Sequence, residues 1–355
     1  MSGLRPLAQP LALSPRGKRK RDRGFRSRAD VLEDCSCANA SGLLSGHGPK
    51  LELQSVSDSR FTMAAVFGSW ADPTGSYLRP ERLADVLSVI AAGGWTIIAG
   101  GTDVYPAHVG KPPPARVVDV SRVAEMRAIV ARDGAWRIGA AVTWAEIADW
   151  DLPPAFRALQ QAARKVGAAQ VQNRATIAGN LCNASPAADG VPPLLALEAK
   201  VELSSLAGVR TLPLEAFIIG YRKTALRADE IFSAVIVPDP APGARSAFVK
   251  LGARKYLVIS IVMAAALIEE GTDCAIARAR VAVGSASEKA CRLGALERDL
   301  VGLPAGVVPS SRLRAEHFDE LSPIDDVRAT AVYRREAALR IVGEALDRAA
   351  AADGA

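Results

Sequence analysis

The chain has 355 residues, of which 49% are hydrophobic and 23% are charged, and its formal net charge is +6. This composition is typical of a globular protein with one or two domains and excludes a largely disordered chain. We expect no membrane segment, because the best candidate, Leu257–Ile268, contains Ser260 and falls short of the roughly 18 residues that span a bilayer. We expect a cytoplasmic protein, because the cysteines are scattered and best read as reduced thiols.

The first 62 residues hold most of the positive charge. They contain 11 Lys and Arg against 6 Asp and Glu, a net of +5, which leaves +1 for the other 293 residues. The basic run Arg16–Arg28 lacks apolar periodicity and a following h-region, so we expect a disordered tail rather than a secretory signal or a nucleic-acid partner. We favour a second interpretation, that residues 1–62 are an overextended start and that the chain begins at Met63, because patterned sequence begins just after this residue.

Residues 63–244 are predicted to form one domain that mixes helices and strands. Thr143 and Glu146 have the spacing of a capping box, and Asp133-Gly134 is typical of a hairpin turn. Helical spacing predicts helices over residues 80–91, from 143, 154–166 and 192–197. Short apolar runs predict strands over residues 96–99, 116–120, 128–131, 136–138, 200–204 and 231–237.

Residues 245–350 are predicted to form a second, smaller domain. Three prolines and a glycine between Pro238 and Arg245 favour a boundary there. The runs 247–251, 258–268 and 275–283 indicate an antiparallel sheet, and helical spacing follows over residues 290–301 and 326–350. In the last helix we expect one apolar stripe, formed by Val327, Ala331, Ala338, Ile341, Val342 and Leu346.

Two short glycine-bearing segments, Ile97–Asp103 and Arg174–Asp189, are predicted to be loops and are the main functional signal. Glycine lets a backbone approach a ligand closely, and successive amide N–H groups form anion-binding concavities. We expect the two segments to bind one long ligand with a central pyrophosphate, although Gly-Gly-Thr-Asp alone is also typical of a simple turn. The chain lacks G-x-x-x-x-G-K-[ST] and G-x-G-x-x-G, which argues against nucleoside triphosphatase and Rossmann sites.

The five cysteines and three histidines lie apart, without metal-ligand spacing, so we expect no metal site and reduced thiols.

These segments resemble the FAD-binding subunit of molybdenum hydroxylases, the xanthine dehydrogenase and carbon monoxide dehydrogenase family. Ala99–Asp103 matches the family motif A-G-G-T-D, and Thr176–Asp189 matches T-I-G-G-N-x-x-N-A-S-P-A-A-D except at Ala178. Further motifs follow in order, at Gly220–Leu226, Lys250–Arg254 and Pro323–Arg334. The resemblance covers about residues 77 to 350.

The resemblance implies an α+β fold, with a two-lobed FAD-binding domain of the vanillyl-alcohol-oxidase type followed by a smaller C-terminal α+β domain. It places Phe232 near the adenine and Lys250 near the flavin or nucleotide, although Lys250 is also compatible with an ordinary strand lysine. It implies no catalytic side chain, since the flavin carries the redox chemistry. The remaining residues implied to bind FAD are Ala99, Gly100, Gly101, Thr102, Asp103, Val104, Thr176, Gly179, Asn180, Ser185 and Asp189.

The resemblance also implies partners, because the chain lacks iron–sulfur cysteine spacing and a molybdopterin domain. We expect a separate 2Fe-2S subunit and a molybdopterin-binding subunit, with electrons passing from iron–sulfur clusters through FAD to NAD+ or another acceptor. One alternative is a stand-alone FAD-dependent oxidase of the vanillyl-alcohol-oxidase type. Such an oxidase needs a substrate cap domain, and the last hundred residues look too small to form one. Another is a non-catalytic scaffold subunit, for which Ala178 is the only indication.

Overall fold

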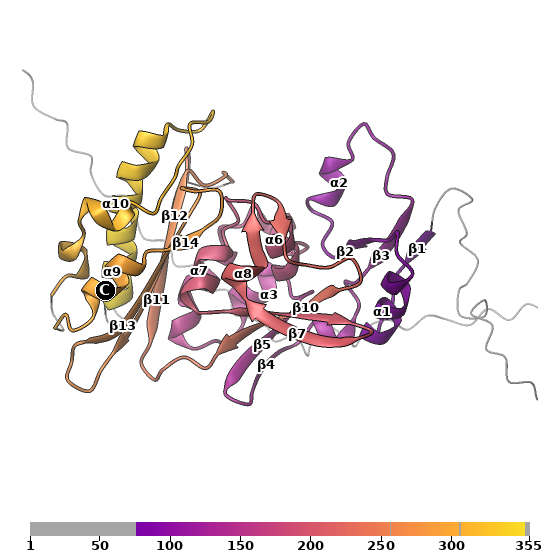
Figure 1. Cartoon of the computed structure of the whole chain (residues 1–355), viewed down its shortest axis with the longest axis horizontal. Helices are drawn as coiled ribbons and strands as arrows, with labels where there is room; N and C mark the ends of the chain where they lie inside the picture. Colours follow the sequence, from indigo (N-terminus) through magenta and orange to yellow (C-terminus); the bar gives the residue numbers. More distant parts are fainter. Residues whose placement is uncertain (1–75, 256, 305–306, 352–355) are drawn as a thin grey trace, which may run out of the picture. The chain divides into compact units, whose positions relative to one another are not determined.

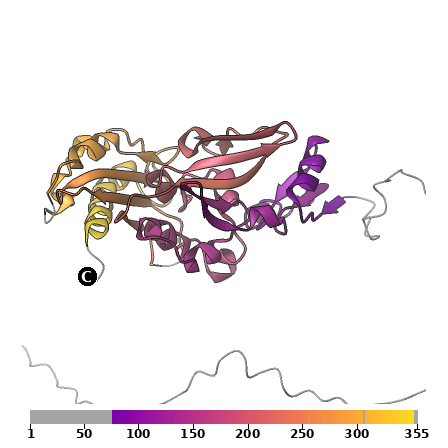
Figure 2. The ribbon, with the colours of Figure 1, turned by 90° about the horizontal axis from the view of Figure 1, so that it is seen from below.

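The first strands form a small parallel sheet in the order β1–β3–β2, coloured indigo and violet (Figure 1; Figure 2). The computed structural model describes residues 76–255, 257–304 and 307–351, so the predicted tail, residues 1–62, lies outside the described residues. Helix α1 buries Val86 and Ile90, and β2 ends one residue before Ala99-Gly100-Gly101. The elements are β1 (Ser76–Leu78), α1 (Leu83–Ala91), β2 (Thr96–Ile98), α2 (Val104–Ala107) and β3 (Arg116–Asp119).

A second sheet is antiparallel, with five strands in the order β4–β5–β10–β6–β7. The predicted hairpin is confirmed, because Asp133 and Gly134 both have positive φ, at 54° and 73°, between paired strands, as a type I′ turn requires. The strands are β4 (Ile129–Arg132), β5 (Ala135–Gly139), β6 (Lys200–Ser205), β7 (Gly208–Pro213) and β10 (Ile231–Pro238). Strand β7 was not among the predicted strands, because its side chains are mostly exposed.

Short helices connect the strands of this sheet. The predicted capping box is confirmed, since Thr143 N–H donates to Glu146 Oε2 (2.7 Å) and Glu146 N–H donates to Thr143 Oγ1 (3.3 Å). The predicted helix 154–166 is in fact a 3-10 turn, Pro154–Phe156, followed by the shorter α4. The elements are α3 (Trp144–Asp149), α4 (Arg157–Ala163), α5 (Ala169–Gln172), α6 (Ile177–Asn183), α7 (Val191–Ala196), α8 (Leu214–Phe217), β8 (Ile218–Gly220) and β9 (Lys223–Thr224), with a further 3-10 turn at Ala124–Met126.

The predicted C-terminal antiparallel sheet is confirmed, in the order β11–β12–β13–β14, and both of its faces are buried. Phe248, Met263 and Leu267 pack into the core that contains α4 and α7. The alternate residues Val262 and Ala264 pack instead against α10 and α9, which lie on the other side of the strands (Figure 1). The elements are β11 (Arg245–Leu251), β12 (Val262–Glu270), β13 (Ile276–Gly284), β14 (Cys291–Arg292) and α9 (Gly294–Leu300), followed by 3-10 turns at Pro309–Arg312 and Ala315–Phe318.

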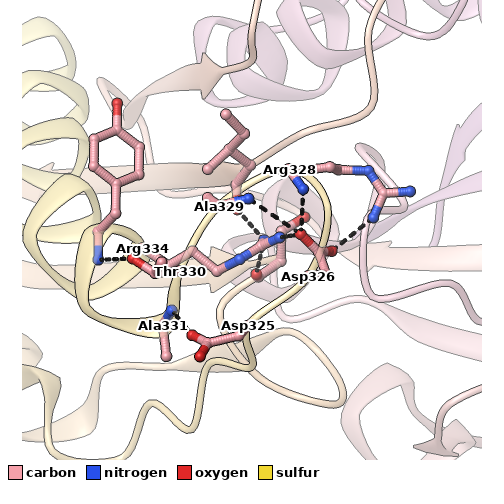
Figure 3. A network of polar contacts seen from close by, with 10 residues as sticks. Asp325, Asp326, Arg328, Ala329, Thr330, Ala331 and Arg334 are labelled. Atoms are coloured by element: carbon pink, nitrogen blue, oxygen red, sulfur yellow. Dashed lines mark hydrogen bonds and ion pairs between the residues drawn. The ribbon is translucent and has the colours of Figure 1, made fainter.

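The last helix, α10 (Ala331–Ala350), begins five residues later than predicted. The Asp326 carboxylate accepts the N–H groups of Arg328 (2.8 Å) and Ala329 (3.2 Å), which forms a turn instead of helix (Figure 3). Thr330 then caps the helix by accepting the Tyr333 N–H. The expectation that Val327 belongs to the apolar stripe is wrong, since Val327 precedes the helix and is 99% exposed.

Arg334 joins this turn to the C-terminal sheet (Figure 3). Its side chain is buried, and Nη1 donates to the carbonyl oxygens of Ile261 (2.5 Å) and Ser285 (2.9 Å). Nη2 donates to Asp326 Oδ1 at 2.6 Å. Desolvation raises the pKa of Asp326. The N–H groups of Arg328 and Ala329 and the Arg334 guanidinium outweigh this effect and lower the pKa from 3.8 to about 2.

This network predicts an acid-dependent loss of stability. A carboxyl whose pKa is lower in the folded state stabilises the fold above its unfolded-state pKa, and this contribution is lost as the pH falls through the folded-state value. The wild-type protein should therefore lose stability between about pH 4 and pH 2 in part through Asp326. In urea titrations from pH 7 to pH 2, Asp326→Asn should be less stable than wild type at pH 7, and the difference should shrink steadily below about pH 4. An equal difference at both ends would contradict this role.

No helix within the described ranges is both long and apolar enough to cross a membrane.

Candidate functional site

The two glycine-bearing segments line one cavity of about 580 Å³. The first segment follows β2, and the second runs through α6 into the turn before α7. The structure brings together eleven of the thirteen residues predicted to bind the cofactor: Ala99, Gly100, Gly101, Thr102, Asp103, Val104, Thr176, Gly179, Asn180, Ser185 and Asp189.

The segments are in direct contact at Gly100. A Cβ atom on Gly100 would lie 2.0 Å from the Arg174 carbonyl oxygen and 2.9 Å from the Ala175 Cα atom. Real Cβ atoms do not approach other atoms this closely, so only glycine lets the two backbones meet here. Gly101 has a φ of +73°, a left-handed conformation that favours glycine at the turn after β2.

The first segment presents free amide donors. Among the described residues, the N–H groups of Gly100, Gly101, Thr102 and Asp103 have no hydrogen-bond partner. Four successive donors of this kind form a concavity that suits the oxygens of a pyrophosphate. The residues present therefore fit the central group of FAD.

The second segment is a short helix where a loop was expected. Thr176 caps α6, and its Oγ1 accepts the Gly179 N–H at 3.1 Å. The apolar residues of α6 pack into the core, and Ala178 is one of them, at 7% exposure. Its N–H donates to the Ala140 carbonyl oxygen. Ala178 does not line the cavity. Alanine in place of the glycine of the family motif therefore does not narrow the cavity.

Asp189, which lines the cavity, forms a buried ion pair with Lys250. Lys250 Nζ donates to Asp189 Oδ2 at 2.6 Å, and the two side chains are 7% and 8% exposed. Ser260 Oγ donates to the other carboxylate oxygen at 2.7 Å. Desolvation raises the pKa of Asp189, and Lys250 and Ser260 oppose this rise. Since both carboxylate oxygens are occupied, Asp189 holds the cavity wall in place.

Phe232 and Lys250 do not line this cavity. Phe232 is 3% exposed, and its ring packs edge-on against Phe217 with 5.3 Å between the ring centroids. Lys250 lines a separate cavity of about 380 Å³ together with Arg164 and Arg254. Lys250 therefore reaches the first cavity only through its ion pair with Asp189.

Twelve residues outside the predicted set also line the cavity, among them Trp144, Cys182, Arg222 and Ile259. The Arg222 N–H donates to the Ala184 carbonyl oxygen, and its guanidinium donates to Asn183 Oδ1 at 3.1 Å. The motif Gly220–Leu226 contains Arg222, but the sequence gave no sign that this residue lines the cavity. Burial raises the pKa of Cys182 to about 12, so this thiol stays protonated. No group of three metal-ligating side chains occurs within the described residues.

Two known families match the chain in sequence. Residues 71–240 match the FAD binding domain in molybdopterin dehydrogenase, and residues 247–349 match the CO dehydrogenase flavoprotein C-terminal domain.

The chain also matches individual relatives over nearly the whole length of each relative. A putative xanthine dehydrogenase FAD-binding subunit from Escherichia coli (strain K12) is 30% identical over 286 residues, which is 79% of this chain and 97% of the relative. Caffeine dehydrogenase subunit beta from Pseudomonas sp. (strain CBB1) is 29% identical over 282 residues, with 77% and 94% covered. A chain of carbon monoxide dehydrogenase from Hydrogenophaga pseudoflava superimposes with a TM-score of 0.70 at 25% identity, with 78% and 97% covered.

Proposed function

Because the chain belongs to the family of FAD-binding subunits of molybdopterin dehydrogenases, we propose that it binds FAD between residues 97–104 and α6 as the flavoprotein subunit of a molybdenum-dependent hydroxylase. The observation that carries this proposal is the row of four free amide N–H groups at Gly100–Asp103, whose residues line one cavity together with residues of α6. These donors would hold the pyrophosphate. When bound, FAD would supply the redox chemistry, and we propose that electrons from iron–sulfur clusters would leave through it to NAD+ or another acceptor.

The roles of the other cavity residues follow from their contacts. Thr176 and Ser185 carry hydroxyl groups and line the same cavity as the residues with free amides. Arg222 brings a positive charge to the cavity, which favours an anionic ligand. Asp189, held by Lys250 and Ser260, keeps the turn before α7 in position.

The proposal includes partners and a division of the chain. We propose a 2Fe-2S subunit and a molybdopterin-binding subunit as partners in the cytoplasm, and an FAD-binding domain of the vanillyl-alcohol-oxidase type that ends near residue 244. Relatives that are themselves named as subunits support the heteromeric complex.

The proposal is tested on the purified full-length chain by its visible spectrum and the mass of the released cofactor. Flavin absorption bands with released FAD, and co-purification with iron–sulfur and molybdenum subunits from the source cells, are expected. A folded protein that stays colourless after incubation with FAD would favour the scaffold alternative. FAD reduction by a small substrate without any partner would favour the stand-alone oxidase.

A further inference from the structure

The separate cavity of about 380 Å³, which we call the basic cavity, concentrates positive charge. Half of its ten lining residues are basic, and among the described residues no Asp or Glu lines it. Residues 63–355 together carry a net charge of only +1, so this concentration is local. Like charges gathered in a hollow attract anions to it. The basic residues are Arg164, Lys165, Lys250, Arg254 and Lys255.

Lys165 and Arg164 have hydrogen-bond donors to spare. Within the described part of the chain, the Lys165 ammonium group makes no hydrogen bond or ion pair, and its side chain is exposed. The Arg164 guanidinium donates through Nη2 to the Ala148 carbonyl oxygen, which leaves most of its five N–H donors for a ligand. These two neighbours in the chain therefore offer charge and donors that the fold itself does not use.

Lys250 is the buried member of the group. Its ammonium nitrogen donates to Asp189 Oδ2 at 2.6 Å and to the Lys165 carbonyl oxygen at 3.3 Å. An ammonium group has three N–H donors, so these two contacts leave one. Because Lys250 lines the basic cavity, this donor can serve a ligand there without breaking the ion pair with Asp189.

The Arg254 guanidinium is held in place by the backbone that follows it. Its Nε and Nη2 donate to the Leu257 carbonyl oxygen at 3.2 and 2.6 Å. Leu257 has a φ of +53°, a left-handed conformation that is uncommon for a residue with a side chain. A Cβ atom on Gly252 would lie 2.3 Å from Val258 Cγ1, so glycine is required for this close approach. The Nη1 donors of Arg254 stay available to a ligand.

The number of charges selects the class of anion. Asp189 offsets only one of the five positive charges, and a single carboxylate would offset only one more. A phosphate group carries between about 1.5 and 2 negative charges at pH 7 and has three acceptor oxygens. We propose that the basic cavity binds a phosphate group, as a second anion site apart from the cavity proposed for FAD. The group comes either from free phosphate or from a phosphate ester, whose organic part would meet the apolar lining residues Leu251, Leu257 and Val258.

The test titrates the full-length chain with inorganic phosphate by isothermal titration calorimetry, at constant ionic strength. FAD is added to saturation, so that the free amides of Gly100–Asp103 do not bind the phosphate. Lys165→Gln removes a cation that has no other contact, and we expect its dissociation constant for phosphate to rise about 10-fold. Lys165→Arg keeps the charge and should bind phosphate nearly as tightly as wild type. Lys200→Gln is the matched control, since Lys200 is exposed on β6 and does not line the basic cavity.

Titration with ADP distinguishes the two sources of the phosphate group. If a phosphate ester is the ligand, ADP should bind the FAD-saturated chain at least about 10-fold more tightly than inorganic phosphate, because its adenosine adds contacts with the apolar lining. Lys165→Gln should then weaken both ligands by the same factor. Equal affinities of ADP and phosphate for the wild-type chain assign free phosphate.

Three results would overturn the phosphate site. The first is a wild-type chain that binds neither phosphate nor ADP, and the second is an unchanged affinity in Lys165→Gln. The third is binding of a hexaglutamate peptide that Lys165→Gln weakens, with no binding of phosphate, which would assign the basic cavity to an acidic protein segment. A chain that fails to bind FAD would count against the proposed function alone, because wild type and Lys165→Gln can still be compared without FAD.

Discussion

Replacing Gly100 by alanine is expected to weaken FAD binding about 100-fold, which corresponds to about 3 kcal/mol. The new Cβ atom would lie 2.0 Å from the Arg174 carbonyl oxygen and 2.6 Å from its carbonyl carbon. These are backbone atoms of the facing segment, so a side-chain rotation cannot relieve the overlap. The two segments must separate, which moves the four amide donors away from α6.

The loss is measured by titrating the apo protein with FAD. The unfolding temperature of the apo form is recorded as well, to show that the variant remains folded. Gly294→Ala is the control, because a Cβ atom there lies in a helix and meets only the end of the flexible Arg298 side chain, at 3.6 Å. That variant should bind FAD normally. Normal binding by Gly100→Ala as well would show that the two segments do not form the cofactor site.

Replacing Lys250 by methionine is expected to lower the free energy of unfolding by about 3–5 kcal/mol, because it leaves a buried carboxylate without its partner. Methionine fills much of the same space, so the lost ion pair with Asp189 dominates the effect. The Ser260 hydroxyl remains as a neutral donor to Asp189 and cannot replace the charge. Urea denaturation of the apo protein at pH 7 measures the difference.

The effect of Lys250→Met should depend on pH. Without the cation, burial raises the pKa of Asp189 further above its unfolded-state value. The folded state then binds a proton more tightly than the unfolded state, so stability falls as the pH rises through the range between the two pKa values. The deficit relative to wild type should be largest at neutral pH and smaller near pH 4.

Lys200→Met, at an exposed position on β6, is the control and should change stability little. A deficit for Lys250→Met as small as that of the control would mean that the ion pair does not stabilise the fold.

All but two of the residues predicted to bind the cofactor line the cavity, because they lie in two glycine-bearing segments that are short and continuous in the sequence. In Gly100–Asp103 and Thr176–Asp189, the residues that line the cavity are neighbours in the chain, so a short motif contains them. Trp144 lies more than thirty residues before α6, and only tertiary contacts bring the start of α3 against that segment. No local pattern could distinguish its indole from an ordinary core residue.

Local hydrogen bonds and burial explain why two predicted elements differ from those observed. At the start of the last helix, the apolar spacing continues back to Val327, but Asp326 captures the backbone N–H groups and forms a turn. In α6, the glycine and asparagine residues suggested a loop, whereas the Thr176 cap and the buried Ile177 and Leu181 stabilise a helix. The C-terminal strands were predictable because burial on both faces requires continuous apolar runs.

The make-up of the cavity wall has a consequence for how the supply of cofactor affects the amount of this protein in the cell. Ile259, Ser260 and Lys250 belong to the C-terminal part of the chain, yet they line the cavity proposed for FAD or hold Asp189 in it. FAD bound in this cavity would therefore stabilise the fold of the last hundred residues as well as the first. At a free concentration 100 times its dissociation constant, it would add about 2.7 kcal/mol to the stability of the protein. Flavin starvation should thus lower the amount of intact protein, through proteolysis of its unfolded form, and not only the fraction that carries cofactor.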